Sequence, residues 1–169
     1  MAWLIKGAVL KFSDNIDTDQ IYPGRYLELT DPKDIAQHAM EGVDPFFLNR
    51  VKESTLIVAG KNFGCGSSRE HAVITLVNAG VKAVVAESFA RIFYRNAINL
   101  GLPALICPGI SQMLQDDSLV ELDLTGGVLR IVDSDCKVNI QKIPSYVAGI
   151  LSKGGLISYL RSTVQMKQP

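Results

Sequence analysis

The chain has 169 residues, of which 47% are hydrophobic and 20% charged, as expected for one globular domain spanning residues 1–169. Its 17 basic and 17 acidic residues balance, so no basic excess indicates a nucleic-acid partner or an anionic membrane surface. No apolar run approaches the length of a membrane span, and Met1–Lys6 is too short and wrongly ordered for a signal peptide.

The first part of the chain combines one strand pattern with loop and helix signals. In chain order the expected elements are a strand over 3–12, a loop over 13–24, a helix from 30 or 31 to about 40, and a short helix over 45–51. Thr30 or Asp31 is placed to cap the first of these helices, and Pro32 suits its first turn. The loop is rich in Asp, Asn, Thr and Pro, which favour turns.

The middle of the chain alternates between short apolar runs and helical patterns. The expected elements are strands over 56–59, 83–86 and 104–107, with helices over 70–79 and 89–100 between them. Two strand–helix units in succession predict parallel strands joined by right-handed crossovers. Uninterrupted apolar strands predict a sheet that is covered on both faces. The fold class is therefore α/β.

After residue 115 the pattern changes to shorter segments separated by turn residues. Strands are expected over 119–124, 128–132 and 137–140, followed by helices over 145–152 and 156–161. The three strands predict a small antiparallel or barrel-like layer added to the parallel sheet.

The three cysteines, Cys65, Cys107 and Cys136, are odd in number and widely spaced. This argues against a disulfide framework and for a reducing cytoplasm. The cysteines lack the short Cys-x-x-Cys spacing of a zinc or iron–sulfur site. The two histidines, His38 and His71, do not strengthen the argument for a metal site. We therefore expect no metal ligands in this chain, so that any metal would come from another protein.

The most informative segment is 61–71, which reads Lys-Asn-Phe-Gly-Cys-Gly-Ser-Ser-Arg-Glu-His and connects an expected strand to an expected helix. Such a turn offers free backbone N–H groups and the positive end of a helix dipole, which suit an anion. Arg69 adds a planar group that can grip a carboxylate or phosphate. The segment is neither a P-loop nor a dinucleotide fingerprint. A tight turn in which Ser67 or Ser68 caps the helix is the alternative.

This segment resembles the signature of the swivelling domain of the aconitase superfamily, in particular the separate small subunits of 3-isopropylmalate dehydratase and homoaconitase. Three further blocks resemble the same proteins in the same order: Asn15–Ile21 with Pro23–Leu27, then Glu87–Ala97, then Asn99–Pro103. The resemblance implies a three-layer β/β/α swivelling domain with a mainly parallel sheet.

The resemblance also implies a reaction, which is dehydration to an enoate followed by rehydration with the hydroxyl moved by one carbon. Ser67 corresponds to the catalytic base, acting as an alkoxide, while Ser68 and Arg69 would hold a carboxylate of a small dicarboxylate or tricarboxylate substrate. The Lewis acid in this family is one iron of a 4Fe–4S cluster on a large subunit. The chain would thus hold no cofactor itself and would work in a heterodimer or heterotetramer.

Other polar residues have a functional and a structural interpretation. Asp19 corresponds to a residue that orients a catalytic histidine of the partner, although an Asx-turn would also explain it. Arg25 either contacts substrate or forms a surface pair. Arg91 and Arg95, one helical turn apart, are expected to form solvated or structural ion pairs.

The segment Tyr26-Leu27-Glu28-Leu29 corresponds to the loop to which substrate choice is attributed. In the family an arginine after the Tyr-Leu pair suits the extra carboxylate of homocitrate-type substrates, and a small or apolar residue suits an alkyl group. Glu28 would repel a carboxylate, and Leu29 could contact an alkyl chain. We therefore expect an isopropylmalate-like substrate and a role in leucine biosynthesis. Dimethylmalate and homoaconitate stay open.

Two alternatives come from other classes of protein. The glycine turn could belong to a free-standing anion- or nucleotide-binding module, which would bind its ligand without a partner. The chain could also be a regulatory paralogue that has lost activity, although Ser67, Ser68 and Arg69 argue against this.

Overall fold

The computed structural model describes residues 3–165 and is built on a seven-stranded sheet. Met1 and Ala2, which open the segment considered above as a signal peptide, lie outside the described residues. The strands are β1 (Leu4–Lys11), β2 (Thr55–Ala59), β3 (Val81–Ala86), β4 (Ala104–Ile106), β5 (Leu119–Asp123), β6 (Val128–Ile131) and β7 (Lys137–Asn139). Their order across the sheet is β4-β3-β2-β1-β5-β6-β7.

The sheet has a parallel part and an antiparallel part that meet at β1. Strands β1 to β4 are parallel to their neighbours, and the register places Leu10 opposite Ile57 and Val85 opposite Leu105. Strand β5 pairs antiparallel with β1, and β6 and β7 continue in the same manner. The predicted strands are confirmed, and the antiparallel layer is a continuation of the parallel sheet.

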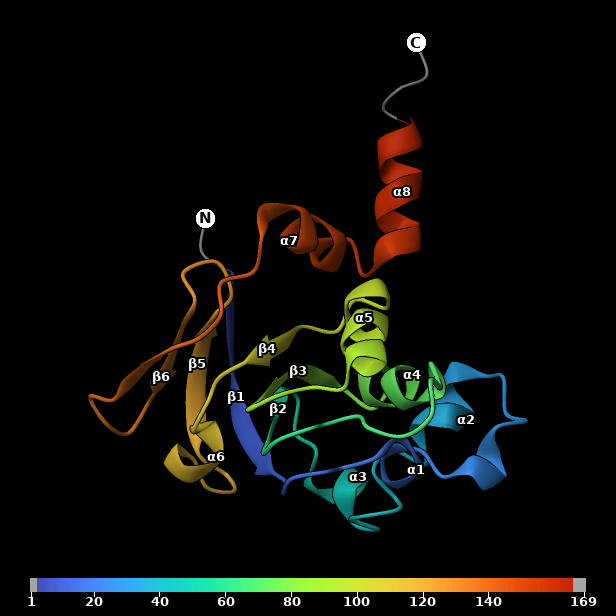
Figure 1. Ribbon diagram of the computed structural model, residues 1–169, viewed down its shortest axis with the longest axis horizontal. Coiled ribbons are helices and arrows are strands. Elements are labelled where there is room, and N and C mark those ends of the chain that lie inside the picture. The colour runs from blue at the N-terminus through green and yellow to red at the C-terminus, as the bar shows by residue number, and fades with distance from the viewer. Residues whose placement is uncertain (1–2, 166–169) are drawn as a thin grey trace.

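Eight α-helices and one 3-10 helix are described over 3–165. They are α1 (Thr18–Ile21), η1 (Gly24–Tyr26), α2 (Pro32–Ala36), α3 (Phe47–Arg50), α4 (His71–Asn78), α5 (Arg91–Asn99), α6 (Ile110–Met113), α7 (Ser145–Ser152) and α8 (Leu156–Gln165). Helices α1 to α5 lie on one side of the parallel strands, and α8 extends away from the rest of the chain (Figure 1).

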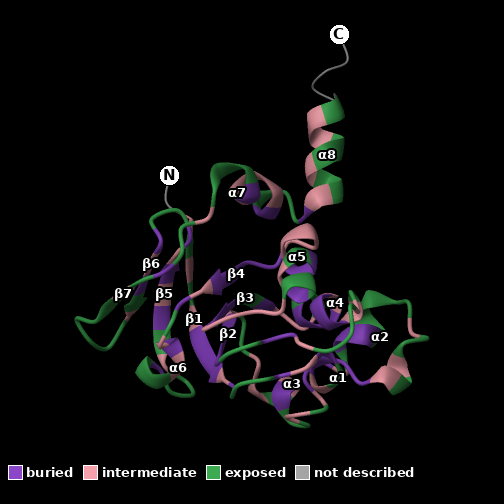
Figure 2. Cartoon of the chain, viewed as in Figure 1, coloured by how far each residue is buried: buried purple, intermediate pink, exposed green. Residues whose placement is uncertain are grey.

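The parallel strands are largely buried on both faces: in Figure 2, β2, most of β3 and the second half of β1 are purple. Ile57 and Ala59 of β2 pack into a core that includes residues of α4 and α5. Leu56 and Val58, which alternate with them, pack into a second core with residues of β5 and β6. The antiparallel strands therefore curl over the face opposite the helices, which produces the expected β/β/α layering.

The helices differ from expectation at several ends, each for a local reason. Helix α1 was expected to be loop, but Asp17 and Gln20 form a capping box that starts it. Helix α2 ends at Ala36, and Met40 adopts a left-handed φ of 58°. Helix α5 begins at Arg91, because residues before it are held extended by backbone pairing with the glycine turn. Helix α6 was not predicted, and α8 runs four residues beyond its expected end.

Within residues 3–165, no helix combines the length and the apolar character that crossing a membrane requires.

Candidate functional site

Three segments that are distant in sequence meet at the carboxyl end of β2. Phe63 pairs with Phe89, since its N–H donates to Ser88 O at 3.0 Å and its carbonyl accepts from Ala90 N–H at 3.0 Å. On the other side of the turn, Thr18 N–H donates to Cys65 O at 2.8 Å. The N-terminal loop and the two strand–helix turns therefore gather at one place.

Two glycines give the turn its shape. Gly64 has a φ of 79° and Gly66 a φ of 99°, values that other residues rarely adopt. A Cβ on Gly64 would lie 2.2 Å from the Phe93 ring, so the backbone rests directly on that side chain. Phe93 is itself buried, with its ring centroid 5.2 Å from that of Phe63. The position of the turn is therefore fixed by a packed aromatic cluster.

Ser67 is held by Thr18 of α1. Its N–H donates to Thr18 Oγ1 at 3.1 Å, and the two hydroxyl oxygens lie 3.2 Å apart. Thr18 is buried, whereas Ser67 is exposed. A fixed, buried hydroxyl thus orients an accessible one. Sequence reasoning assigned no role to Thr18, although the Asp-Thr-Asp block that contains it was recognised.

Arg69 and Asp19 form an ion pair beside Ser67. Arg69 Nη1 donates to Asp19 Oδ1 at 3.0 Å, and Gly24 N–H donates to the same oxygen at 2.8 Å. The hydrogen bond from Arg69 and the one from Gly24 hold the pKa of the Asp19 carboxyl below its ordinary value. Within the described residues, no hydrogen bond or ion pair uses Asp19 Oδ2 or Arg69 Nη2, so both atoms can still bind a group from outside the chain.

The serines do not cap the following helix, which corrects the structural alternative considered for this turn. Helix α4 begins at His71, and its N-cap residue, Glu70, makes no side-chain capping bond. Ser68 is exposed, and its carbonyl accepts from the Nδ2 group of the buried Asn96 at 3.5 Å. The turn is therefore tied to α5 as well as to α1, and its hydroxyls stay available.

Arg25 belongs to a network centred on Glu41. Its Nη2 lies 2.5 Å from Glu41 Oε1, and its guanidinium lies over the Tyr26 ring, 4.7 Å from the centroid. Tyr26 OH donates to the same Glu41 oxygen at 2.8 Å, and His38 Nδ1 lies 2.7 Å from the other. Of the two interpretations offered for Arg25, the isolated chain displays the surface pair.

The residues assigned to substrate choice lie next to this network. Leu29 N–H donates to Tyr26 O at 3.0 Å, which ties the segment to η1. Glu28 is exposed and Leu29 is half-buried. The charged side chain therefore has access to solvent, while the apolar one is partly covered.

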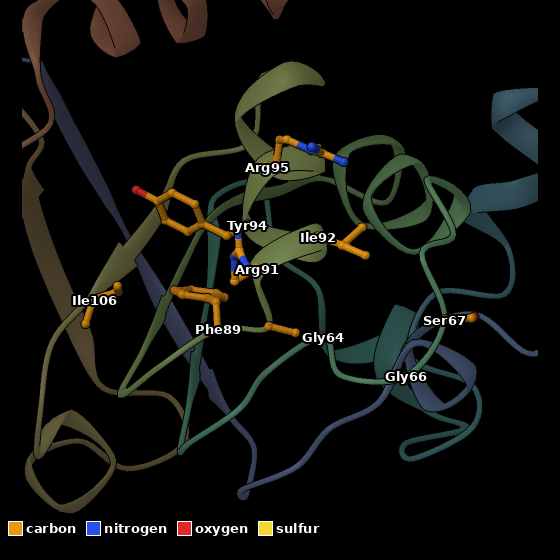
Figure 3. Close-up of a pocket in the computed structure, with 10 residues that line it drawn as sticks. Gly64, Gly66, Ser67, Phe89, Arg91, Ile92, Tyr94, Arg95 and Ile106 are labelled. Carbon is orange, nitrogen blue, oxygen red and sulfur yellow. The ribbon is translucent and has the colours of Figure 1, made fainter.

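A cavity of about 790 Å³ opens on the other side of the turn. Its lining consists of Gly64, Gly66, Ser67, Phe89, Ala90, Arg91, Ile92, Tyr94, Arg95 and Ile106 (Figure 3). Arg91 and Arg95 are exposed and make no ion pair within residues 3–165, so the ion pairs expected for them are absent there. Phe89 is half-buried and lines the cavity.

Comparison with known proteins identifies the family. The Aconitase C-terminal domain family matches residues 5–108. The chain belongs to this family. It is 51% identical to the 3-isopropylmalate dehydratase small subunit 1 of Methanopyrus kandleri over 158 residues, covering 94% of this chain and 93% of that one.

Two further relatives come from Methanocaldococcus jannaschii. The isopropylmalate/citramalate isomerase small subunit of that organism is 48% identical and covers 99% of this chain and 100% of its own. The crystal structure of its 3-isopropylmalate dehydratase, LeuD, superimposes with a TM-score of 0.91 at 46% identity, again covering 99% and 100% of the two chains. The likeness therefore extends over both the site and the antiparallel strands.

The family's 4Fe–4S cluster does not fit the residues of this chain. Cys107 is buried, Cys136 is exposed and Cys65 lies within the glycine turn, each as a free thiol. Burial raises the pKa of the Cys107 thiol, which disfavours the thiolate that a metal requires. Over 3–165 no three His, Cys, Asp or Glu side chains are grouped to hold a metal ion.

Proposed function

We propose that this chain is the small subunit of a 3-isopropylmalate dehydratase, a hydro-lyase that interconverts 2-isopropylmalate and 3-isopropylmalate in leucine biosynthesis. The observation that carries the proposal is that Thr18 and Asp19 of α1 contact Ser67 and Arg69 of the glycine turn. Relatives that match more than 90% of the chain at about half identity support it.

Ser67 is proposed as the base that removes a proton from the carbon next to the leaving hydroxyl. A serine hydroxyl is a weak acid, so its alkoxide needs hydrogen-bond donors and positive charge nearby. Because Thr18 Oγ1 accepts from Ser67 N–H, its own proton is free to point at Ser67 Oγ. Arg69, two residues away, adds a fixed positive charge.

Ser68 and Arg69 are proposed to hold a substrate carboxylate. Asp19 occupies Nη1 of Arg69, which fixes the guanidinium plane and leaves Nη2 for the ligand. Asp19 in turn keeps Oδ2 for a partner group, in keeping with a role in orienting a histidine of the large subunit. Arg25, Glu28 and Leu29 are proposed to contact the part of the substrate away from the carboxylate that Ser68 and Arg69 hold.

A cluster-bearing large subunit is the proposed partner, in a heterodimer or heterotetramer. In this family the cluster acts as the Lewis acid on the leaving hydroxyl, and within residues 3–165 no group of side chains is placed to hold a metal that would supply this chemistry. Ser67 and Asp19 are both exposed, as residues that face a second subunit must be. The three free thiols favour a reducing compartment, and we propose the cytoplasm as the site of action.

Citramalate is a second candidate substrate, favoured by one observation. The relative from Methanocaldococcus jannaschii, which matches 99% of this chain, is named an isopropylmalate/citramalate isomerase small subunit. Citramalate carries a methyl group where isopropylmalate carries an isopropyl group. A half-buried Leu29 is compatible with both alkyl groups.

The deciding experiment is an anaerobic dehydratase assay of the full chain with the large subunit encoded beside it, after reconstitution of the cluster. Isopropylmalate, citramalate, dimethylmalate, homoaconitate and citrate would be compared as substrates. Ser67→Ala is the test variant, and Ser158→Ala, an exposed serine of α8, is the matched control.

Turnover of an alkylmalate that Ser67→Ala abolishes and Ser158→Ala preserves would establish the class and rank the substrates. A stable complex with no turnover of any of the five would count against the proposed reaction. Failure to form a complex would favour the free-standing binding module.

A further inference from the structure

We infer that the arginine-lined cavity beside the glycine turn receives an acidic segment of the large subunit. This inference rests on the proposed function, and it concerns a surface to which neither the sequence motifs nor the names of the relatives assign a role. The cavity is bounded by α5, the end of β4 and the rim of the glycine turn. Its lining contains two arginines and no carboxylate.

The two arginines differ from three other arginines of the chain in having no ion-pair partner among the described residues. Arg25, Arg50 and Arg69 each make an ion pair with a carboxylate of this chain. Arg91 and Arg95 lie one turn apart on α5, are exposed and have no ion-pair partner within the described residues. Like charges at this spacing destabilise an isolated helix slightly. A carboxylate from outside the chain would relieve that repulsion.

The apolar lining favours a protein as the occupant. Phe89 and Tyr94 are half-buried, and Ile92 remains 43% exposed. Arginine together with aromatic side chains is the composition enriched in the centres of protein–protein interfaces, where charge pairs are desolvated. The chemistry that fits is an aspartate or glutamate flanked by apolar residues.

The position of the cavity favours the large subunit over other proteins. Gly66 and Ser67 line its rim, so the cavity is continuous with the turn that must face the large subunit if Ser67 is the base. In Figure 3 the Ser67 side chain points away from Arg91 and Tyr94. The arginines therefore do not converge on the reacting atom, which argues against a substrate carboxylate as their ligand.

The test measures the dissociation constant between the full chain and the cluster-loaded large subunit at low and high salt. Arg91→Gln/Arg95→Gln removes both charges, and Arg91→Glu/Arg95→Glu reverses them. The matched control is Arg130→Gln/Lys137→Gln, which removes two exposed cations that face each other across β6 and β7. Substrate KM and kcat are measured in parallel at saturating large subunit.

We expect the neutral double variant to raise the dissociation constant about tenfold or more at low salt, and the reversed variant to raise it further. The salt dependence should be smaller in the neutral variant, while kcat at saturation and the control stay at wild-type values. Thermal melting would establish that each variant is folded.

An unchanged dissociation constant for the reversed variant would overturn the inference. So would a rise in KM for isopropylmalate with unchanged subunit affinity, since the arginines would then serve the substrate. If the wild-type chain turns over substrate with its large subunit, either result leaves the proposed function standing. If the wild-type chain binds no large subunit, the proposed function and this inference fail together.

Discussion

Thr18 and Ser67, 49 residues apart in sequence, are joined through both the main chain and the side chain of the serine. Thr18 Oγ1 accepts from Ser67 N–H at 3.1 Å and lies 3.2 Å from Ser67 Oγ. Thr18→Val removes this hydroxyl while keeping the shape. We expect kcat to fall about ten- to hundredfold, because one hydrogen bond to a charged group is worth about 1.5–3 kcal/mol.

Two variants separate this effect from a general loss of stability. Thr18→Ser keeps the hydroxyl and should retain most of the activity. Thr55→Val removes another buried hydroxyl, which accepts from Lys52 N–H at 2.9 Å and lies away from the turn. It should lower the melting temperature with kcat unchanged. Wild-type kcat in Thr18→Val would show that Thr18 does not assist Ser67.

Gly64 allows a test of how tightly the turn is packed. Its φ of 79° and the position of the Phe93 ring, 2.2 Å from a Cβ, penalise any side chain there. We expect Gly64→Ala to lower the free energy of unfolding by about 3 kcal/mol, as backbone strain and overpacking add. Denaturant unfolding monitored by circular dichroism measures this change.

Gly154 is the matched control for Gly64, because its φ is 76° and no atom lies within 4 Å of its Cβ position. Gly154→Ala should lower the free energy of unfolding by about 1 kcal/mol, because it adds backbone strain without overpacking. Equal destabilisation by the two variants would mean that contact with Phe93 contributes nothing.

The parallel part of the fold and the gathering of the site could be predicted because their signals are local. Apolar runs such as Leu56–Ala59 define the parallel strands, and the topology then brings their carboxyl ends together. The role of Thr18 could not be predicted, since it depends on a contact with a residue 49 positions away. The environment of Arg91 was misjudged because helical spacing does not reveal whether a carboxylate of another element lies nearby.

Glu41 provides a pH-dependent test of the network around Arg25. Burial raises the pKa of this carboxyl, but the hydrogen bonds from His38, Tyr26 and Arg25 outweigh it and leave the pKa below its ordinary value of 4.5. Because the folded pKa is the lower one, the network stabilises the fold above pH 4.5 and this contribution is lost as the pH falls through the folded pKa.

We therefore expect Glu41→Gln to lower the free energy of unfolding by about 1 kcal/mol at neutral pH, a modest value because the network is partly exposed. The difference from wild type should shrink as the pH falls below 4.5. Glu53→Gln, an exposed glutamate without an ion pair within the described residues, should show no such trend. A difference that does not change with pH would contradict the assigned network.

Glu28 tests whether the loop after η1 selects the substrate. The side chain is exposed next to the half-buried Leu29, so it can be replaced without disturbing the core. Glu28→Arg exchanges a charge that repels a third carboxylate for one that attracts it. We expect the ratio of kcat/KM for homoaconitate to that for isopropylmalate to rise about tenfold, equivalent to about 1.4 kcal/mol. Glu53→Arg, an equal charge change at another exposed glutamate, should leave this ratio of kcat/KM values unaltered. An unaltered ratio in Glu28→Arg itself would show that position 28 does not contribute to substrate selection.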